Sequence, residues 1–149
     1  MPEINYWAIL VAALSSIVIG SLWYGPLFGR IWMEGMGWPV NDKAAMDKMM
    51  ADGKKQMPLL YGQQLVLSIL MAFVFAHVLW AFSVAPGMEG MTWLMAGLNG
   101  GFWMWLGFIL PIIYGTSLWN GKKFKYTAVE LGYWLVLLLV MGWIISAWK

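Results

Sequence analysis

The chain has 149 residues, of which 62% are hydrophobic and only 11% charged, a composition typical of membrane proteins rather than soluble domains. A formal net charge of +2 gives no reason to expect nucleic acid as a partner. Cysteine is absent, which excludes disulfides, thiol chemistry, Cys-ligated zinc and iron–sulfur clusters.

Four long runs without charged side chains predict the fold class. A helix of about 20 residues crosses the hydrocarbon core of a bilayer. Because backbone groups find no water there, such runs must be helical. We therefore predict an all-α protein, a four-transmembrane-helix bundle with antiparallel neighbours, in a single integral membrane domain. The expected helices are 4–28, 58–84, 91–118 and 127–148, within the domain 1–149.

The segment between the first two helices is expected to contain a short amphipathic helix over 42–53. Asn41 or Asp42 can cap its start, and Gly53 can end it. Lys–Asp pairs spaced i,i+4 lie on its polar side (Lys43/Asp47 and Lys48/Asp52), and methionines lie on the other (Met46, Met49 and Met50). Such a helix suits the cytoplasmic surface of the membrane, although the methionine face could instead bind a protein partner.

Basic residues are concentrated in alternate loops. Loops 29–57 and 119–126 contain all the Lys and Arg residues except Lys149. By the positive-inside rule, both loops are cytoplasmic and both termini lie outside. We expect a multi-pass protein of the bacterial cytoplasmic (inner) membrane.

Small residues recur at four-residue spacing, which places them on one helix face and lets helices approach closely in a bilayer. They are Ala8, Ala12, Ser16 and Gly20 on the first helix and Gly97 and Gly101, then Gly107, Pro111 and Gly115, on the third. These faces can pack within one bundle. Because they are numerous for so small a bundle, we also expect a homo-oligomer, formed through the first-helix face.

His77, the only histidine, falls within the second expected helix. Ionisable residues inside the membrane are functional candidates, and imidazole suits switching near neutral pH. Asn99 on the third helix is expected at a similar depth, so the two could form a ligand or proton site. The alternatives are a neutral imidazole bonded to a neighbouring helix and, more remotely, a haem ligand; we expect no cofactor.

Glu130 is the only carboxylate within the expected helices. Thr127-Ala128-Val129-Glu130 fits a capping box, in which Thr127 caps the helix and Glu130 returns a hydrogen bond to the cap. The functional alternative is a proton-binding carboxylate that faces Gln63 and Gln64 near the inner surface.

Signatures of catalysis are missing from the sequence. It has no G-x-S-x-G elbow and no H-E-x-x-H motif. Zinc and non-haem iron sites usually need two or three histidines or carboxylates together, so we expect no metal site. We name no catalytic residue and lean against an enzyme.

Motifs rich in glycine and aromatic residues resemble those of an uncharacterised bacterial family of small four-helix membrane proteins, catalogued as domain of unknown function 1761. They are Trp23-Tyr24-Gly25-Pro26-Leu27-Phe28-Gly29, Gly101-Phe102-Trp103-Met104-Trp105-Leu106-Gly107-Phe108, Gly132-Tyr133-Trp134 and Met141-Gly142-Trp143. The resemblance spans nearly the whole chain in the right order. It implies a four-helix membrane domain and no assigned activity or catalytic residue.

Three classes of function remain open. Polar residues gather at the two ends of the expected helices around an apolar middle, which counts against a continuous water path through one chain. We expect a membrane-embedded binding or accessory subunit that self-associates and contacts lipid and other membrane proteins. The alternatives are a proton-linked transporter or channel of a small solute, using His77 or Glu130, and a membrane enzyme acting on a lipid-soluble substrate.

Overall fold

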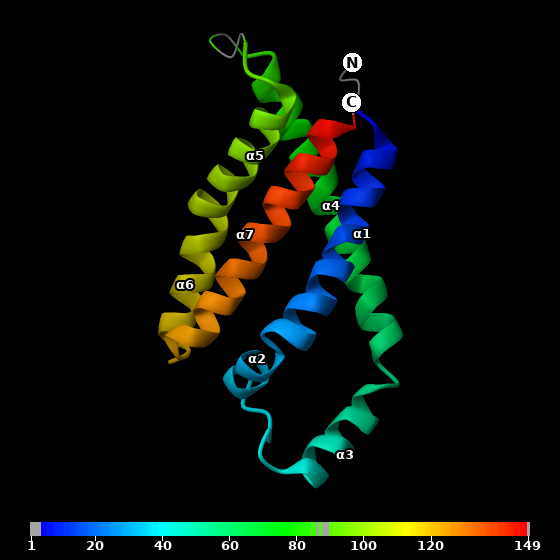
Figure 1. Cartoon of the computed structure of the whole chain (residues 1–149), viewed down its shortest axis with the longest axis vertical. Helices are drawn as coiled ribbons and strands as arrows, with labels where there is room; N and C mark the ends of the chain where they lie inside the picture. Colours follow the sequence, from blue (N-terminus) through cyan, green and yellow to red (C-terminus); the bar gives the residue numbers. More distant parts are fainter. Residues whose placement is uncertain (1–3, 86, 88–89, 149) are drawn as a thin grey trace.

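The computed structural model describes residues 4–85, 87 and 90–148, and this part of the chain is helical with no strand (Figure 1). It contains four helices long and apolar enough to cross a membrane. The candidate spans are Tyr6–Leu27, Met57–Ser83, Trp93–Trp119 and Phe124–Ala147. The predicted all-α, four-span fold class is confirmed.

Two of the spans contain a π-helical turn. The first span consists of α1 (Tyr6–Leu22) and η1 (Trp23–Leu27), and the third consists of α5 (Trp93–Met104), η2 (Trp105–Ile109) and α6 (Leu110–Trp119). The other two spans are α4 (Met57–Ser83) and α7 (Phe124–Ala147). Two shorter helices, α2 (Gly29–Gly35) and α3 (Lys43–Gly53), lie between the first and second spans.

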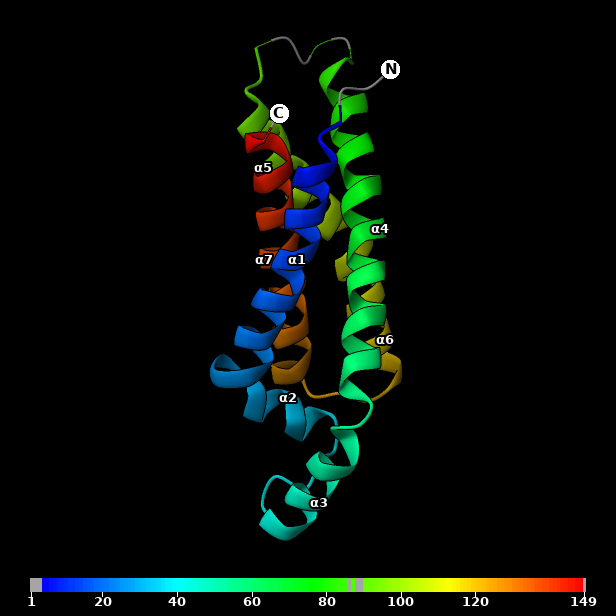
Figure 2. The ribbon, with the colours of Figure 1, turned by 90° about the vertical axis from the view of Figure 1, so that its right-hand side faces the viewer.

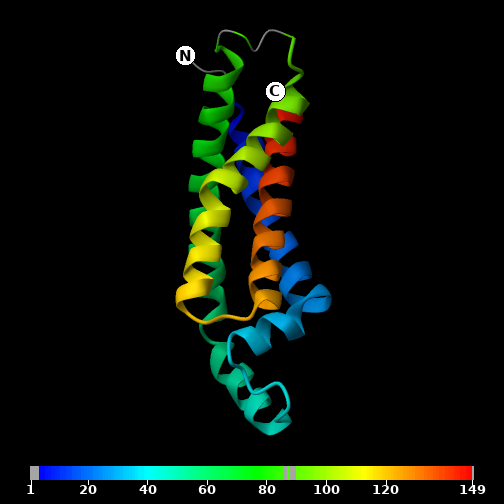
Figure 3. The same ribbon diagram turned by 90° about the vertical axis from the view of Figure 1, so that its left-hand side faces the viewer.

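Consecutive spans run antiparallel, so the molecule has two distinct ends (Figures 1 and 2). One end, which we call the basic end, carries α2, α3 and the turn between α6 and α7. The opposite end, the terminal end, carries the start of α1, the end of α4, the start of α5 and the end of α7. α3 projects beyond the bundle at the basic end (Figure 3).

The loop helix α3 lies close to its expected position. The Asp42 carboxylate caps it by accepting a hydrogen bond from the Ala45 amide at 3.0 Å. Within the residues that the structure describes, the one ion pair joins Arg30 to Glu34 on α2, at 3.0 Å. The Lys–Asp pairs expected on α3 are therefore not formed.

The core lies where α1, α4, α5 and α7 meet, and small residues bring these helices together. On α1, Ser16 donates a hydrogen bond of 2.7 Å to Ser68 on α4. Gly97 on α5 and Gly142 on α7 touch so closely that a Cβ on either would collide with the backbone of the other. This packing follows the rule that small residues let helices approach within a bilayer.

The small-residue face of α1 is used within the single chain. Ala8, Ala12 and Ser16 are each at most 1% exposed, and Gly20 lies beside the Tyr133 ring. With α4 and α7 packed against it, this face has no room for a second copy. Self-association stays a prediction, and it would need a different surface.

The expected capping box at Thr127 is wrong, because α7 begins about one turn earlier, at Phe124. Lys123 is the residue that precedes the helix, and no side chain caps it. Thr127 therefore lies inside the helix, where its hydroxyl bonds back to the Lys123 carbonyl at 3.4 Å. Glu130 is thus not a capping residue.

The π-helical turn η1 has a local cause in Pro26. Proline has no amide hydrogen, and its ring clashes with the carbonyl of the fourth residue before it, so the regular α-helical ladder is broken there. The Phe28 amide bonds instead to the Trp23 carbonyl, five residues back, at 2.9 Å. The first span therefore widens just before it ends.

Candidate functional site

The turn η1 brings two aromatic side chains against α7. The indole N–H of Trp23 donates to the Val129 carbonyl at 3.0 Å. The Tyr24 ring packs against Tyr133, with ring centroids 4.9 Å apart. A Cβ at position 132 would lie 2.9 Å from the Trp23 ring, so glycine at this position leaves room for the indole.

The second π-helical turn, η2, contacts the same part of α7 from another side. The indole N–H of Trp105 donates to the Leu131 carbonyl at 2.9 Å. The carbonyls on both sides of Glu130 thus each accept an indole N–H from a different span. These two bonds fix the backbone of α7 at Glu130, and π-helical turns are frequent at functional sites.

The carboxyl group of Glu130 is half-buried and faces aromatic hydrogen-bond donors. The Tyr24 hydroxyl and the Trp32 indole N–H are the hydrogen-bond donors that lie near it. Their two rings lie 5.4 Å apart between centroids, and Tyr133, 6% exposed, completes the group. We call Glu130, Tyr24, Trp32 and Tyr133 the Glu130 site.

The Glu130 site has no basic partner in the described part of the chain, where Arg30–Glu34 is the one ion pair. An ionised carboxylate can accept bonds from Tyr24 and Trp32, whereas a protonated one can donate. Aromatic rings are grouped around it, and the faces of such rings attract cations. The arrangement can therefore hold a proton or a cation.

Trp32 reaches this site because α2 is docked on the start of α7. The ammonium group of Lys122 donates to the Gly35 carbonyl, at the end of α2, at 2.7 Å. The same group lies 5.2 Å from the centre of the Tyr126 ring. Tyr126 packs so closely on Gly35 that a Cβ there would collide with its ring.

His77 is bonded within its own helix rather than to a neighbouring one. Its Nδ1 lies 2.8 Å from the Phe73 carbonyl oxygen, and its ring lies 4.2 Å from the Phe73 ring. Asn99 is exposed on α5, and its side chain makes no hydrogen bond to the described residues. No interaction among those residues joins His77 to Asn99, and their role as a ligand site stays a prediction.

Gln63 and Gln64 lie on α4, apart from the Glu130 site. Gln63 is exposed. Gln64 donates to the Ser68 hydroxyl at 3.3 Å, and Ser68 in turn accepts from Ser16. Gln64 therefore belongs to a hydrogen-bond chain between α4 and α1. The described residues contain no group of three His, Asp or Glu that could hold a metal.

The partners of Glu130 were not predicted from the sequence, although their motifs were noticed. Trp23 and Tyr24 come from the first Gly/aromatic motif, Trp105 from the second, and Gly132 and Tyr133 from the third. The first and second motifs lie far from Glu130 along the chain and are brought to it by the fold, whereas the third follows Glu130 directly in the sequence.

The fold defines a multi-pass membrane protein with four candidate spans. A family model described as "Protein of unknown function (DUF1761)" matches residues 7–146, so the chain belongs to this family. The match extends over nearly all of the four spans and the Glu130 site. No curated protein and no solved structure matches the chain.

Proposed function

We propose that the protein is a membrane-embedded binding protein whose Glu130 site takes up a monovalent organic cation, such as an amine or a quaternary ammonium ion, in exchange for a proton. This proposal rests on one observation. Residues of two Gly/aromatic motifs bond to the α7 backbone on both sides of Glu130, and the carboxyl group of Glu130 lies within a candidate span and has no basic partner in the described part of the chain.

The chemistry of the site favours an organic cation over a metal ion. A carboxylate within the membrane is costly unless it is neutralised by a proton or paired with a positive charge. Hard metal ions prefer six or more oxygen ligands, and Glu130 is the one carboxylate of the site. A weakly hydrated organic cation instead gains from the faces of Tyr24, Trp32 and Tyr133.

Calorimetry can test this proposal with benzyltrimethylammonium as the probe and the protein in lipid nanodiscs. We expect the affinity to fall as the pH is lowered, because a proton then competes for the Glu130 carboxylate. Binding should also release protons, which titrations in two buffers of different ionisation enthalpy detect.

The matched variants are Glu130→Gln and Glu34→Gln, each of which removes one negative charge. Glu130→Gln should weaken binding about tenfold or more, the range for a hydrogen bond to a charged group. Glu34→Gln should bind like the parent, because Glu34 pairs with Arg30 on the exposed side of α2. Equal binding by all three proteins, or binding without proton release, would refute the proposal.

We also propose that loops 29–57 and 119–126 face the cytoplasm from a bacterial inner membrane. The support is that the basic residues of both loops lie at the basic end. A homo-oligomer is the third part of this proposal, and it could use η2 and α6. There, Gly107 and Gly115, one on each side of Pro111, have open space where a Cβ would lie.

A further inference from the structure

Methionines are concentrated in the segment between the first and second spans. Six of the 13 methionines of the chain lie within residues 29–57. Met46, Met49 and Met50 lie within five residues of one another, and no other stretch of this length holds three methionines. All three belong to α3, which projects beyond the bundle at the basic end (Figure 3). We call these three residues the methionine cluster, and it lies outside the candidate spans.

The α-helix places the three thioethers of this cluster side by side. Residues three and four apart on a helix are neighbours, with Cβ atoms about 5–6 Å apart, and Met46 has Met49 and Met50 at these spacings. A methionine side chain has three rotatable bonds, so the sulfurs can turn toward a common point. Met49 and Met50 are 38% and 52% exposed, and Met46 is half-buried. A small ligand can therefore reach the cluster.

The sulfur atoms of the methionine cluster are available to a ligand. Within the described part of the chain, none of the three takes part in a hydrogen bond. The Met36 sulfur, in contrast, accepts a contact of 3.6 Å from the Tyr126 hydroxyl. Cysteine is absent from the sequence, so thioethers are the only soft ligands that this chain can offer to a metal ion.

Thioether sulfur selects a particular kind of metal ion. Soft sulfur ligands favour Cu(I), whereas Mg²⁺ and Ca²⁺ prefer oxygen ligands. Zinc and non-haem iron sites usually contain histidines or carboxylates, and the described residues contain no group of three His, Cys, Asp or Glu that could hold such an ion. That finding concerns a different set of ligands and does not bear on three methionines.

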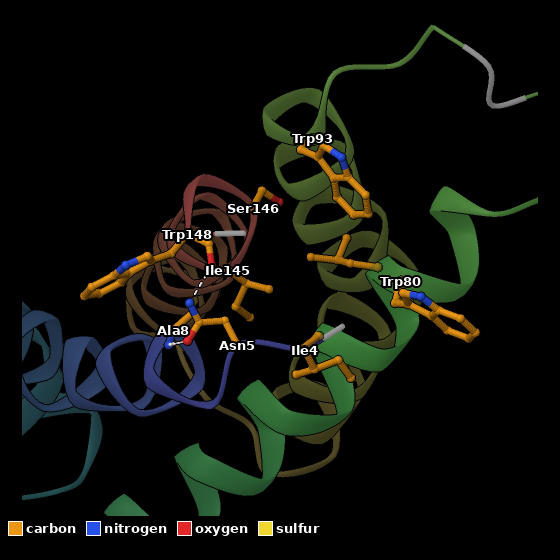
Figure 4. A pocket seen from close by; sticks show the side chains of 10 residues that line it. Ile4, Asn5, Ala8, Trp80, Trp93, Ile145, Ser146 and Trp148 are labelled. Atoms are coloured by element: carbon orange, nitrogen blue, oxygen red, sulfur yellow. Dashed lines mark hydrogen bonds between the residues drawn. The ribbon is translucent and has the colours of Figure 1, made fainter. Parts of the chain in front are cut away.

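The small cavity at the terminal end offers nothing comparable. It has a volume of about 40 Å³ and lies where α1, α4, α5 and α7 converge (Figure 4). No methionine, histidine or charged residue is among the residues that line it. A soft metal ion would find no sulfur there, and the Glu130 site offers it only a carboxyl group and aromatic rings. The methionine cluster is therefore the place in the described structure where such an ion fits.

We propose that Met46, Met49 and Met50 bind one Cu(I) ion through their three thioether sulfurs. The ion keeps its oxidation state, and no bond of the protein forms or breaks besides those to the metal. Thioethers carry no proton, unlike thiols and imidazolium ions, so binding releases none. The affinity should therefore be independent of pH, which distinguishes this site from the proton-linked site at Glu130.

NMR of the protein in lipid nanodiscs, with the methionine methyl groups labelled with ¹³C, can test this site. Ag(I) serves as the probe, because it is a soft monovalent ion like Cu(I) and is stable in air. We expect the methyl signals of Met46, Met49 and Met50 to shift together and to saturate at one ion per chain, with equal affinity at about pH 5.5 and about pH 7.5. The signals of Met36 and Met91 should not move. Equal shifts of all exposed methionines, or the same three shifts with Zn²⁺, would refute the proposal.

Two leucine variants provide the control, because leucine keeps the apolar surface and removes the sulfur. Met49→Leu should weaken Ag(I) binding at least about tenfold, since losing even a residue that only supports a metal ligand costs about 10-fold to 100-fold. Met91→Leu replaces a methionine that is 43% exposed at the terminal end and should bind like the parent. Leucine and methionine have similar helix propensities, so circular dichroism should show equal helical content in all three proteins. Parental affinity in Met49→Leu would show that the cluster is only an apolar face of α3.

Discussion

At the scale of single residues, glycines decide how closely the spans approach. Gly97 and Gly142 form the contact between α5 and α7, whereas Gly107 on η2 has open space around the position of a Cβ. In the sequence, all these positions look the same, because each is a small residue on a face of a helix. Which of them face another helix depends on the rotation of each span, and spacing alone does not determine it.

We expect Gly97→Ala to destabilise the protein by about 1–3 kcal/mol, the usual cost of overpacking a closely packed contact. The added methyl group would meet the Gly142 backbone, which cannot move aside as a flexible side chain can. Gly107→Ala is the matched control and should change the stability by less than about 1 kcal/mol. Thermal unfolding in detergent measures both. Equal stability of the two variants would show that the contact between α5 and α7 is looser than the structure describes.

Glu130 and His77 illustrate what the sequence can predict about a site. It identified both as ionisable residues within the spans, because a charge-free run makes any exception visible. Their partners could not be predicted in the same way. Phe73 is one turn from His77, but Tyr24 and Trp32 are far from Glu130 along the chain and reach it only through η1 and α2.

At the scale of elements, α2 is a helix that the sequence does not predict. It has seven residues, begins and ends with glycine, and would be too short to be stable as an isolated helix. Its contacts with α7 stabilise it. These are tertiary contacts, which a local sequence pattern does not predict. The π-helical turns could not be predicted for a related reason. Composition indicates a helix, but it does not indicate which carbonyl each amide bonds to.

Lys122 should hold α2 in place, because its ammonium group bonds to the last carbonyl of that helix. We expect Lys122→Met to loosen α2 and speed cleavage by chymotrypsin at Trp38, in the loop that follows, by about twofold to tenfold, as for one hydrogen bond. Lys125→Met removes an equal charge from an exposed side chain for which the structure shows no contact, so it should be cleaved like the parent. Faster cleavage of both variants would indicate a general charge effect rather than a lost bond.

At the scale of the whole molecule, the sequence predicted the bundle well because one physical constraint dominates. An uncharged apolar run of about 20 residues that crosses a bilayer forms a helix there, so four spans follow from four such runs. The way in which the spans pack against one another could not be predicted from the sequence. The face of α1 assigned to a second copy packs instead on α4 and α7, since the same small residues serve contacts within and between chains.

The distribution of charge between the two ends predicts how the molecule lies in its membrane. Cysteine is absent from the chain, so a single introduced thiol can be labelled without background. Because basic loops are retained in the cytoplasm, Lys48→Cys and Lys123→Cys should react in intact cells only with reagents that cross the membrane. Met91→Cys, beyond the other ends of the spans, should also react with an impermeant maleimide. Reaction of the two basic-end thiols with the impermeant reagent, and protection of Met91→Cys, would reverse the orientation and place the Glu130 site at the external surface.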